Sequence, residues 1–230
     1  MSGVIVHSDC GVTLVGGGEL SASCVTEALT IAPCLVAADG GADAVLRLGL
    51  VPQAVIGDLD SITSAARAAL APERLHLIAE QDTTDFDKCL RSIAAPFVLA
   101  VGFSGARMDH GLAVFHGLVQ WPDARCVVVG PQDICFLAPP EIALDLAVGT
   151  RLSLFPMGAV RGTGTGLRWP VDGLDFAPDT CIGTSNQTSA RRVVLGFDQP
   201  LMLIILPTDC LSAVIAAWPT SPWPARARGG

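Results

Sequence analysis

Aspartates in four short polar segments are the residues of this chain with the clearest chemical potential. Each segment lies at the end of a run of apolar residues or a few residues after it. The segments are ADGGA (38–42), IGDLDS (56–61), QDTTD (81–85) and GARMDH (105–110). Carboxylates that are held close together repel one another, and a hard divalent cation such as Mg²⁺ binds them through oxygen. If the fold gathers these segments, they predict a magnesium site that acts on a phosphorylated substrate.

The elements that must position these segments can be predicted from hydrophobic periodicity. Short apolar runs alternate with amphipathic stretches, which is typical of a parallel sheet covered by helices. Ligands of such a sheet bind at the carboxyl ends of its strands, so the four segments are expected at one edge. We predict strands at 12–15, 34–38, 54–56, 75–78, 97–101 and 126–129, and helices at 23–30, 42–48, 64–70, 85–93 and 109–120.

The sequence pattern changes after about Pro139. Short β-type runs follow, separated by turn residues such as Asp172 and Gly173, and they predict a small antiparallel β domain. The runs lie at 151–155, 166–170, 192–195 and 201–205. We therefore expect an α/β domain over residues 1–138, a β domain over 139–217 and a mobile tail over 218–230.

Composition and charge exclude several classes of protein. The chain has 230 residues, of which 50% are hydrophobic, so it is long enough to bury a core. Its net charge of −8 argues against nucleic acid or anionic lipid as a partner. The start lacks the pattern of a signal peptide, and no apolar run is long enough to span a membrane. Eight cysteines without a CxxC pair indicate reduced thiols in the cytoplasm.

The motifs of the common nucleotide-binding folds are absent from the sequence. Neither GxxxxGK[ST] nor GxGxxG occurs, although the run of glycines at 16–18 allows backbone N–H groups to approach a phosphate. Lys88 is the only lysine. We therefore expect phosphate charge to be neutralised by a metal ion, Arg107 and backbone amides.

Each acidic segment also has a purely structural explanation. The first can be a tight turn, and the second a loop with a helix cap. In the third, Thr84 and Asp87 can form a capping box, and in the fourth, Arg107 and Asp109 can form a surface ion pair. Their joint occurrence after successive strands favours the functional interpretation.

The four segments resemble those of the thiamine pyrophosphokinase family. SLFP (153–156), GLRWP (166–170) and the pair Ser185-Asn186 match this family in the same order. The resemblance implies a Rossmann-like catalytic domain with flanking helices, a C-terminal antiparallel β-sandwich, and a homodimer with thiamine sites at its interface. It also implies transfer of diphosphate from Mg·ATP to the hydroxyl of thiamine, with AMP as the second product.

The resemblance assigns roles by matching position. Mg²⁺ would be bound by Asp58, Asp60 and Asp85, and Asp39 would lie beside them as the fourth carboxylate of the site. Around ATP and the reacting hydroxyl would lie Gln81, Asp82, Thr84, Arg107 and Asp109, and either Asp85 or Asp109 would accept the hydroxyl proton. Thiamine would be contacted by Ser185 and Asn186 and covered by Trp169, because an aromatic face suits a flat cation.

Three alternative functions remain open at this point. A diphosphokinase for another alcohol, such as a hydroxymethylpterin, would share the aspartates and differ in the β domain. A non-catalytic thiamine-binding protein would not need a complete metal site. A metal-dependent phosphohydrolase would release phosphate without an acceptor alcohol.

Overall fold

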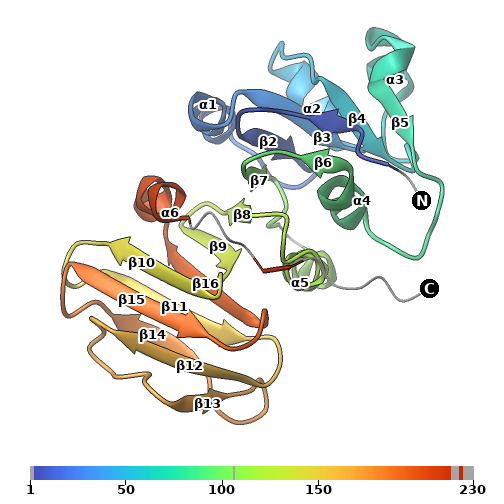
Figure 1. Cartoon of the computed structure of the whole chain (residues 1–230). Helices are drawn as coiled ribbons and strands as arrows, with labels where there is room; N and C mark the ends of the chain where they lie inside the picture. Colours follow the sequence, from blue (N-terminus) through green and yellow to red (C-terminus); the bar gives the residue numbers. More distant parts are fainter. Residues whose placement is uncertain (1–2, 106, 219–222, 225–230) are drawn as a thin grey trace. The chain divides into compact units, whose positions relative to one another are not determined.

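The computed structural model describes residues 3–105, 107–218, 223 and 224. It divides into two compact units, Met1–Val129 and Gly130–Gly230, which are coloured blue to green and yellow to red in Figure 1. This division differs from the boundary expected at 138/139, because β9 (Asp133–Leu137) pairs with β16 (Met202–Pro207) of the second unit. The strand β9 therefore belongs to the second unit.

The first unit is built on a parallel sheet with the strand order β8-β7-β2-β3-β4-β5. The strands are β2 (Val12–Val15), β3 (Cys34–Ala38), β4 (Ala54–Gly57), β5 (Leu75–Leu77), β7 (Val98–Val101) and β8 (Cys126–Val129). Every residue of β2, β4 and β7 is buried, as expected for a parallel sheet covered on both faces. The chain order reverses between β2 and β7, which is the position where open α/β sheets bind ligands.

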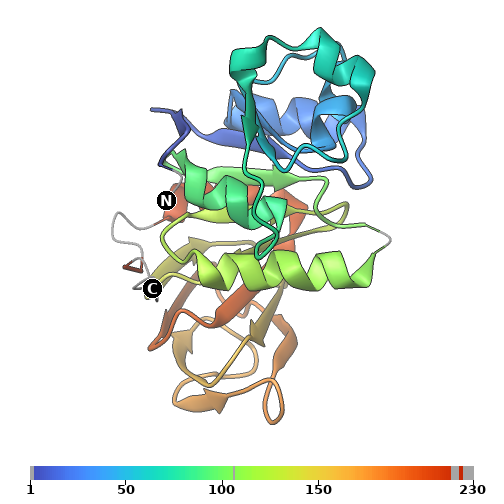
Figure 2. The ribbon, with the colours of Figure 1, turned by 90° about the vertical axis from the view of Figure 1, so that its right-hand side faces the viewer.

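Helices connect the strands of the first unit. They are α1 (Ala22–Ile31), α2 (Gly41–Arg47), α3 (Ser64–Ala69), α4 (Asp85–Ser92) and α5 (Met108–Gln120), with a 3₁₀ turn η1 (Pro72–Arg74) and a short parallel pair of β1 (Val6–His7) with β6 (Ile93–Ala94). In Figure 2, α4 and α5 lie side by side on the face turned to the viewer. The sequence prediction of this unit is confirmed, because each expected strand and helix is present with its ends shifted by at most one residue.

The second unit consists of two antiparallel sheets with the orders β14-β11-β16-β9 and β10-β15-β12-β13. Its other elements are β10 (Glu141–Asp145), β11 (Arg151–Pro156), β12 (Val160–Thr165), β13 (Leu174–Phe176), β14 (Gly183–Gln187), β15 (Arg192–Phe197), η2 (Thr208–Cys210) and α6 (Leu211–Ala217). Alternate residues of β15 are buried, which is typical of a strand with one face on a core. The expected antiparallel β domain is confirmed.

The strand predicted at 166–170 is wrong. The strand β12 ends at Thr165, and Gly166 then adopts a φ of +84°, which turns the chain. Only Leu167 pairs again, in an isolated bridge with Thr188. The GLRWP segment is therefore a loop, and Trp169 is presented from it.

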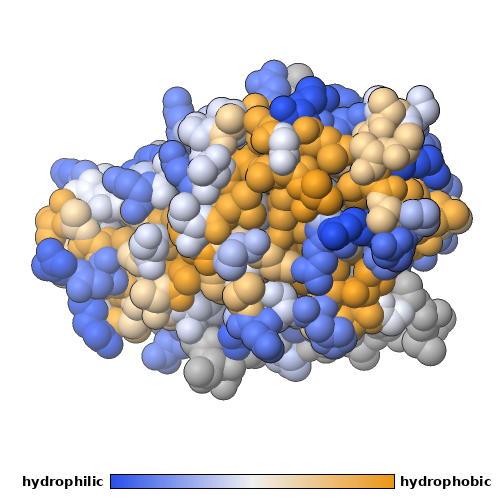
Figure 3. Space-filling view, turned by 90° about the horizontal axis from the view of Figure 1, so that it is seen from above, coloured by the Kyte–Doolittle hydropathy of each residue, from blue (hydrophilic) through white to orange (hydrophobic). Residues whose placement is uncertain are grey.

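The terminal segment and the surface complete the description. Of the expected tail, only residues 218, 223 and 224 are described, and the indole of Trp223 donates a hydrogen bond to the carbonyl of Ala138 at 2.7 Å. Among the described residues, no helix is both long and apolar enough to cross a bilayer. Apolar residues do reach the surface among hydrophilic ones on the face shown in Figure 3, as they do on most folded proteins.

Candidate functional site

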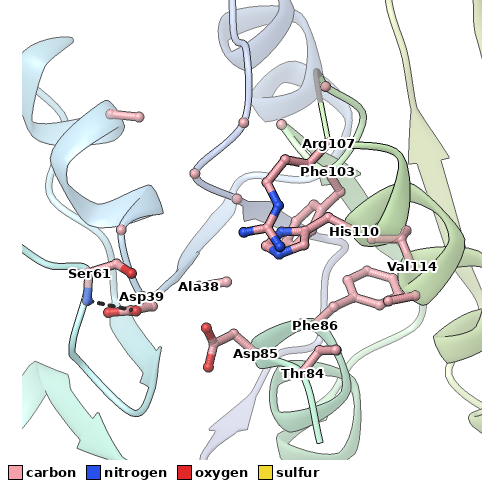
Figure 4. A pocket seen from close by; sticks show the side chains of 18 of the residues that line it. Ala38, Asp39, Ser61, Thr84, Asp85, Phe86, Phe103, Arg107, His110 and Val114 are labelled. Carbon is pink, nitrogen blue, oxygen red and sulfur yellow. Dashed lines mark hydrogen bonds between the residues drawn. The ribbon is translucent and has the colours of Figure 1, made fainter.

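The loops at the carboxyl ends of four strands line one cavity of the first unit, with a volume of about 910 Å³. Its walls include residues 16–19 after β2, Asp39 after β3, Asp58 after β4 and residues 102–105 after β7. In Figure 4, Asp39, Ser61 and Asp85 lie on one side, and Phe86, Phe103 and Val114 lie on the other. The cavity thus has an acidic wall and, facing it, a largely apolar wall that also carries Arg107 and His110, at the predicted edge of the sheet.

Three aspartates form the centre of the acidic wall: Asp39 and Asp58 line the cavity, and the exposed Asp60 lies beside them without being among its described lining residues. Asp39, Asp58 and Asp60 each offer a carboxylate oxygen, and these oxygens lie within 4.8 Å of one another. Asp85 belongs to the same group, because a Cβ built on Gly57 would lie 2.9 Å from Cβ of Asp39 and 3.0 Å from Oδ1 of Asp85. The structure therefore brings together three of the four predicted acidic segments.

Asp39 is the most buried of these carboxylates, with 3% of its surface exposed. Its Oδ2 accepts a hydrogen bond from the backbone N–H of Ser61 at 3.1 Å, and its buried Oδ1 has no donor among the described residues. Burial raises the pKa of Asp39, and the nearby carboxylates of Asp85 and Asp58 act in the same direction against the hydrogen bonds from Ser61. A buried acceptor without a donor is costly, and a cation would satisfy it.

Lys88 lies inside the acidic wall, and the sequence analysis assigned it no role. Its Nζ is 3.0 Å from Oδ1 of Asp85 and 3.5 Å from Oδ2 of Asp58, and its side chain is 2% exposed. The signal in the sequence was the spacing of Asp85 and Lys88, since residues three apart share one face of a helix. Burial alone would lower the pKa of Lys88, but the hydrogen bond and charge of Asp85, together with Asp58, outweigh it and raise the pKa.

Asp58 is held in its charged form by two partners. Nε2 of Gln81 donates to its Oδ2 at 3.0 Å, and Lys88 lies on the same oxygen. Burial acts to raise the pKa of Asp58, but the hydrogen bond from Gln81 and the charge of Lys88 outweigh it, so the pKa is lowered. Gln81 thus contacts the acidic wall, whereas Asp82 is exposed and is not among the described residues that line the cavity.

The start of α4 is fixed by the predicted capping box. Oγ1 of Thr84 accepts a hydrogen bond from the N–H of Asp87 at 3.2 Å, and Oδ2 of Asp87 accepts from the N–H of Thr84 at 3.2 Å. The indole of Trp121 at the end of α5 donates to Oδ1 of Asp87 at 3.2 Å. These bonds anchor the first turn of α4, from which Asp85 and Lys88 project.

Arg107 and Asp109 form the ion pair that the structural explanation predicted. Nε and Nη2 of Arg107 lie 3.2 and 2.6 Å from the two carboxylate oxygens of Asp109. The hydrogen bond from Arg107 lowers the pKa of Asp109 to about 2. Arg107 lines the cavity, whereas Asp109 is not among its described lining residues.

In the second unit, the three predicted thiamine contacts lie together. Trp169 is 52% exposed, and the guanidinium of Arg168 lies 4.8 Å from its ring centroid. The side chain of Asn186 is buried: its Oδ1 accepts from the N–H of Trp169 at 3.2 Å, and its Nδ2 donates to the carbonyl of Trp169 at 2.8 Å. Ser185 is exposed and has a φ of +59°. Asn186 therefore holds the loop that presents Trp169.

Family models match both units of the chain. The model of the thiamin pyrophosphokinase catalytic domain matches residues 25–129, and that of the thiamin pyrophosphokinase vitamin B1 binding domain matches residues 141–202. The chain belongs to the thiamine pyrophosphokinase family. The first match contains the acidic wall, and the second contains Trp169, Ser185 and Asn186, so the resemblance found in the sequence is confirmed.

Related proteins agree with this assignment. Thiamine pyrophosphokinase 1 of Oryza sativa subsp. japonica is 28% identical over 204 residues, which cover 74% of this chain and 77% of the relative. Thiamine pyrophosphokinase of Bacillus subtilis (strain 168) is 26% identical over 186 residues, 76% of this chain and 87% of the relative.

Solved structures of the family share the fold. The thiamine pyrophosphokinase of Bacillus subtilis superposes with a TM-score of 0.71 at 23% identity, covering 86% of this chain and 99% of that chain. The yeast thiamin pyrophosphokinase gives a TM-score of 0.71 at 16% identity, covering 90% and 89%. The expected fold class is thereby confirmed.

Proposed function

We propose that this chain transfers the diphosphate group of ATP to the hydroxyl of thiamine and releases AMP. The observation that carries the proposal is the cavity at the reversal point of the parallel sheet, one wall of which is acidic, in a chain of the thiamine pyrophosphokinase family. An open sheet binds its ligand at that point, and a phosphate chain needs charge neutralisation there.

The acidic wall fits a divalent metal ion. The oxygens of Asp39, Asp58 and Asp60 lie within 4.8 Å of one another, and the buried Oδ1 of Asp39 lacks a donor among the described residues. These carboxylates would hold Mg²⁺, a hard cation that prefers oxygen ligands. Asp85 stays in the proposed set with Oδ2 as the atom left to face a metal ion or the reacting hydroxyl, because its Oδ1 accepts a hydrogen bond from Lys88. When bound, Mg²⁺ supplies neutralisation of phosphate charge.

The chain's own groups complete the phosphate site. Residues 16–18 line the cavity after β2, where the N–H groups of Gly16 and Gly18 donate to the carbonyls of Val101 and Gly102. The N–H of Gly17 and the guanidinium of Arg107 are therefore the groups that we assign to the phosphates. Their task is to hold the β-phosphorus in line with the attacking hydroxyl, which supplies much of the catalysis in phosphoryl transfer. Thr84 lines the same cavity, whereas Gln81 acts through Asp58. Asp82 remains an expected substrate contact.

Asp85 is the better supported of the two candidate general bases. A base with a strongly lowered pKa accepts protons poorly, and Arg107 lowers the pKa of Asp109 to about 2. Asp85 lines the cavity, whereas Asp109 is not among the described lining residues. We therefore assign proton acceptance to Asp85 and positioning of Arg107 to Asp109.

We assign the binding of thiamine to residues of the second unit. The half-exposed ring of Trp169 would cover the pyrimidine, and the exposed hydroxyl of Ser185 would contact the vitamin. Asn186 would act by holding the Trp169 loop, because its amide is bonded to the backbone of Trp169. The proposal includes a homodimer in which Trp169 reaches the thiamine of the other copy, and a cytoplasmic location in which the eight cysteines stay reduced.

Product analysis tests this function. The purified protein is mixed with Mg·ATP, with and without thiamine, and nucleotides and thiamine esters are separated by chromatography. Equal amounts of AMP and thiamine diphosphate, both dependent on thiamine, are expected. ADP with thiamine monophosphate would show attack on the γ-phosphorus instead. Turnover with a hydroxymethylpterin but not with thiamine, or phosphate release without any acceptor, would replace the proposal with one of the alternative functions.

A further inference from the structure

The acidic wall contains two different positions for a cation. One lies among Asp39, Asp58 and Asp60, whose oxygens are within 4.8 Å of one another. The other lies between Asp58 and Asp85 and is filled by the ammonium of Lys88, at 3.5 and 3.0 Å. Asp58 is shared by both positions, so the occupant of one affects the charge felt in the other.

We propose that Lys88 is a built-in cation that takes the place of a second divalent ion, so that the chain without nucleotide binds a single divalent cation. The inference rests on the metal-dependent function proposed above. In this role Lys88 is a positioning residue, which holds the carboxylates of the β4 loop and of α4 at one spacing before any ligand arrives.

The hydrogen-bonding of the carboxylates separates the two positions. Oδ1 of Asp85 already accepts a hydrogen bond from Lys88, whereas Oδ1 of Asp39 is buried and has no donor among the described residues. The atom that lacks a partner therefore belongs to the first position, and the second position is satisfied by the protein itself. A divalent cation in the first position would supply the contact that Oδ1 of Asp39 lacks, and Asp85 could reach that cation only through its Oδ2.

Burial keeps the ammonium group of Lys88 in the second position of the folded protein. Its side chain is 2% exposed, and the turn of α4 that carries it is anchored by the capping box of Thr84 and Asp87. An ammonium taken out of water needs nearby carboxylates, and those carboxylates need the ammonium. Removing its charge leaves Asp58 and Asp85 uncompensated and opens a place for a metal ion.

Counting bound Mn²⁺ in the absence of nucleotide tests the inference without any turnover. The wild type, Lys88→Gln, Lys88→Arg and Arg191→Gln are titrated with Mn²⁺ and followed by electron paramagnetic resonance. Arg191→Gln is the matched control, because it removes one positive charge from an exposed ion pair with Asp145. We expect one Mn²⁺ per chain for the wild type, Lys88→Arg and Arg191→Gln, and a second Mn²⁺ for Lys88→Gln.

Two results would overturn the inference: two Mn²⁺ on the wild type without nucleotide, or unchanged number and affinity in Lys88→Gln. If Lys88→Gln does not fold, two other variants decide the question. Asp39→Asn should weaken Mn²⁺ binding at least about tenfold, because a charge next to the ion is lost. Asp85→Asn should weaken Mn²⁺ binding less than Asp39→Asn does, because Lys88 already compensates the Asp85 carboxylate, and the reverse order of effects would refute the two positions.

The product assay separates this inference from the proposed function. A chain that forms AMP and thiamine diphosphate but binds two Mn²⁺ without nucleotide refutes the inference alone. A chain that binds one Mn²⁺ in the expected manner but forms neither product refutes the proposed function alone.

Discussion

The acidic wall of the first unit and the Trp169 loop of the second use opposite physical means to prepare for a ligand. In the acidic wall, Asp39 and Lys88 are buried charged residues, and Lys88 compensates the partly buried carboxylates of Asp58 and Asp85. In the loop, the recognition surface is exposed, and the buried part is the neutral amide of Asn186. The first arrangement is sensitive to charge, and the second to shape and hydrogen bonding.

This difference indicates that the acidic wall depends on its balance of charges, whereas the Trp169 loop depends on its backbone geometry. Burial strengthens the interactions between charges, and a buried charge without a partner lowers the stability of the fold. A substitution that removes the charge of Lys88 from the acidic wall is therefore expected to be strongly destabilising. A neutral side chain that bonds to the backbone fixes a loop at little electrostatic cost, so the Trp169 loop can vary in charge and keep its geometry. The predictions below test this contrast from the largest expected effect to the smallest.

Replacing the shared carboxylate should have the largest effect. We expect Asp58→Asn to lower kcat by about 10³-fold or more, because a metal-binding charge is lost from the phosphate site. The measurement is steady-state formation of AMP at saturating ATP and thiamine, with circular dichroism to show that the fold is kept. Turnover within a few-fold of the wild type would remove Asp58 from the metal site.

Neutralising the buried ammonium should affect stability more than any change in the Trp169 loop. Without divalent ions, Lys88→Met leaves two carboxylates unpaired and should lower the free energy of unfolding by about 3 kcal/mol. Urea denaturation measures this, and adding Mg²⁺ should recover more stability in the variant than in the wild type. Equal stability of the two proteins would mean that the ion pairs contribute nothing net.

Removing the exposed ring should act on one substrate only. We expect Trp169→Ala to raise the KM for thiamine about tenfold, because removing the ring removes a cation–π interaction with the ligand of roughly 1–2 kcal/mol. The KM for ATP and the melting temperature should stay close to those of the wild type, and Trp169→Phe should lie in between. A parallel rise in both KM values would show that Trp169 does not act at the thiamine end.

The buried amide should couple loop geometry to thiamine binding. Asn186→Ala leaves the N–H and carbonyl of Trp169 without their partner and should cost about 1–3 kcal/mol of unfolding free energy. The KM for thiamine should rise together with this loss, while Ser185→Ala should change the KM without changing stability. Calorimetry and initial rates on the same preparations compare the two variants.

The exposed ion pair at the cavity wall should give the smallest effect. The pKa of Asp109 is lowered to about 2, so its contribution to stability is present above the unfolded value of about 3.9 and is lost as the pH falls towards 2. The melting temperatures of the wild type and Asp109→Asn should therefore differ slightly at pH 6 and converge near pH 2. Loss of turnover at pH 7 as large as in Asp85→Asn would make Asp109 the base instead.

The two units also differ in how far the sequence predicts them. In the first unit, the apolar runs and the cap at Thr84 are local signals, and they place the helices and strands to within one residue. In the second unit, β12 (VRGTGT) contains two glycines, and β14 (GTSNQ) contains glycine and asparagine, which are residues depleted in strands. These strands form because they pair with neighbours that the sequence does not identify.

The candidate site shows the same limit. Strand order brings Asp39, Asp58 and Asp85 together, and this was predictable because parallel strands end at one edge. The spacing of Asp85 and Lys88 indicates a shared helix face, but the contact of Lys88 with Asp58 depends on four side-chain torsions. The bonds of Asn186 depend on how a loop closes, so these two contacts did not follow from the pattern. Likewise, the pairing of Asp109 with Arg107 was one of two open interpretations.

The buried location of Lys88 has a practical consequence for chemical labelling. It is the only lysine of the chain and its side chain is 2% exposed. Amine-reactive dyes and lysine-modifying enzymes therefore find no lysine side chain on the surface of the native protein. Acylation of Lys88 can occur only when the acidic wall opens, so its rate gives a direct readout of that opening from a single atom.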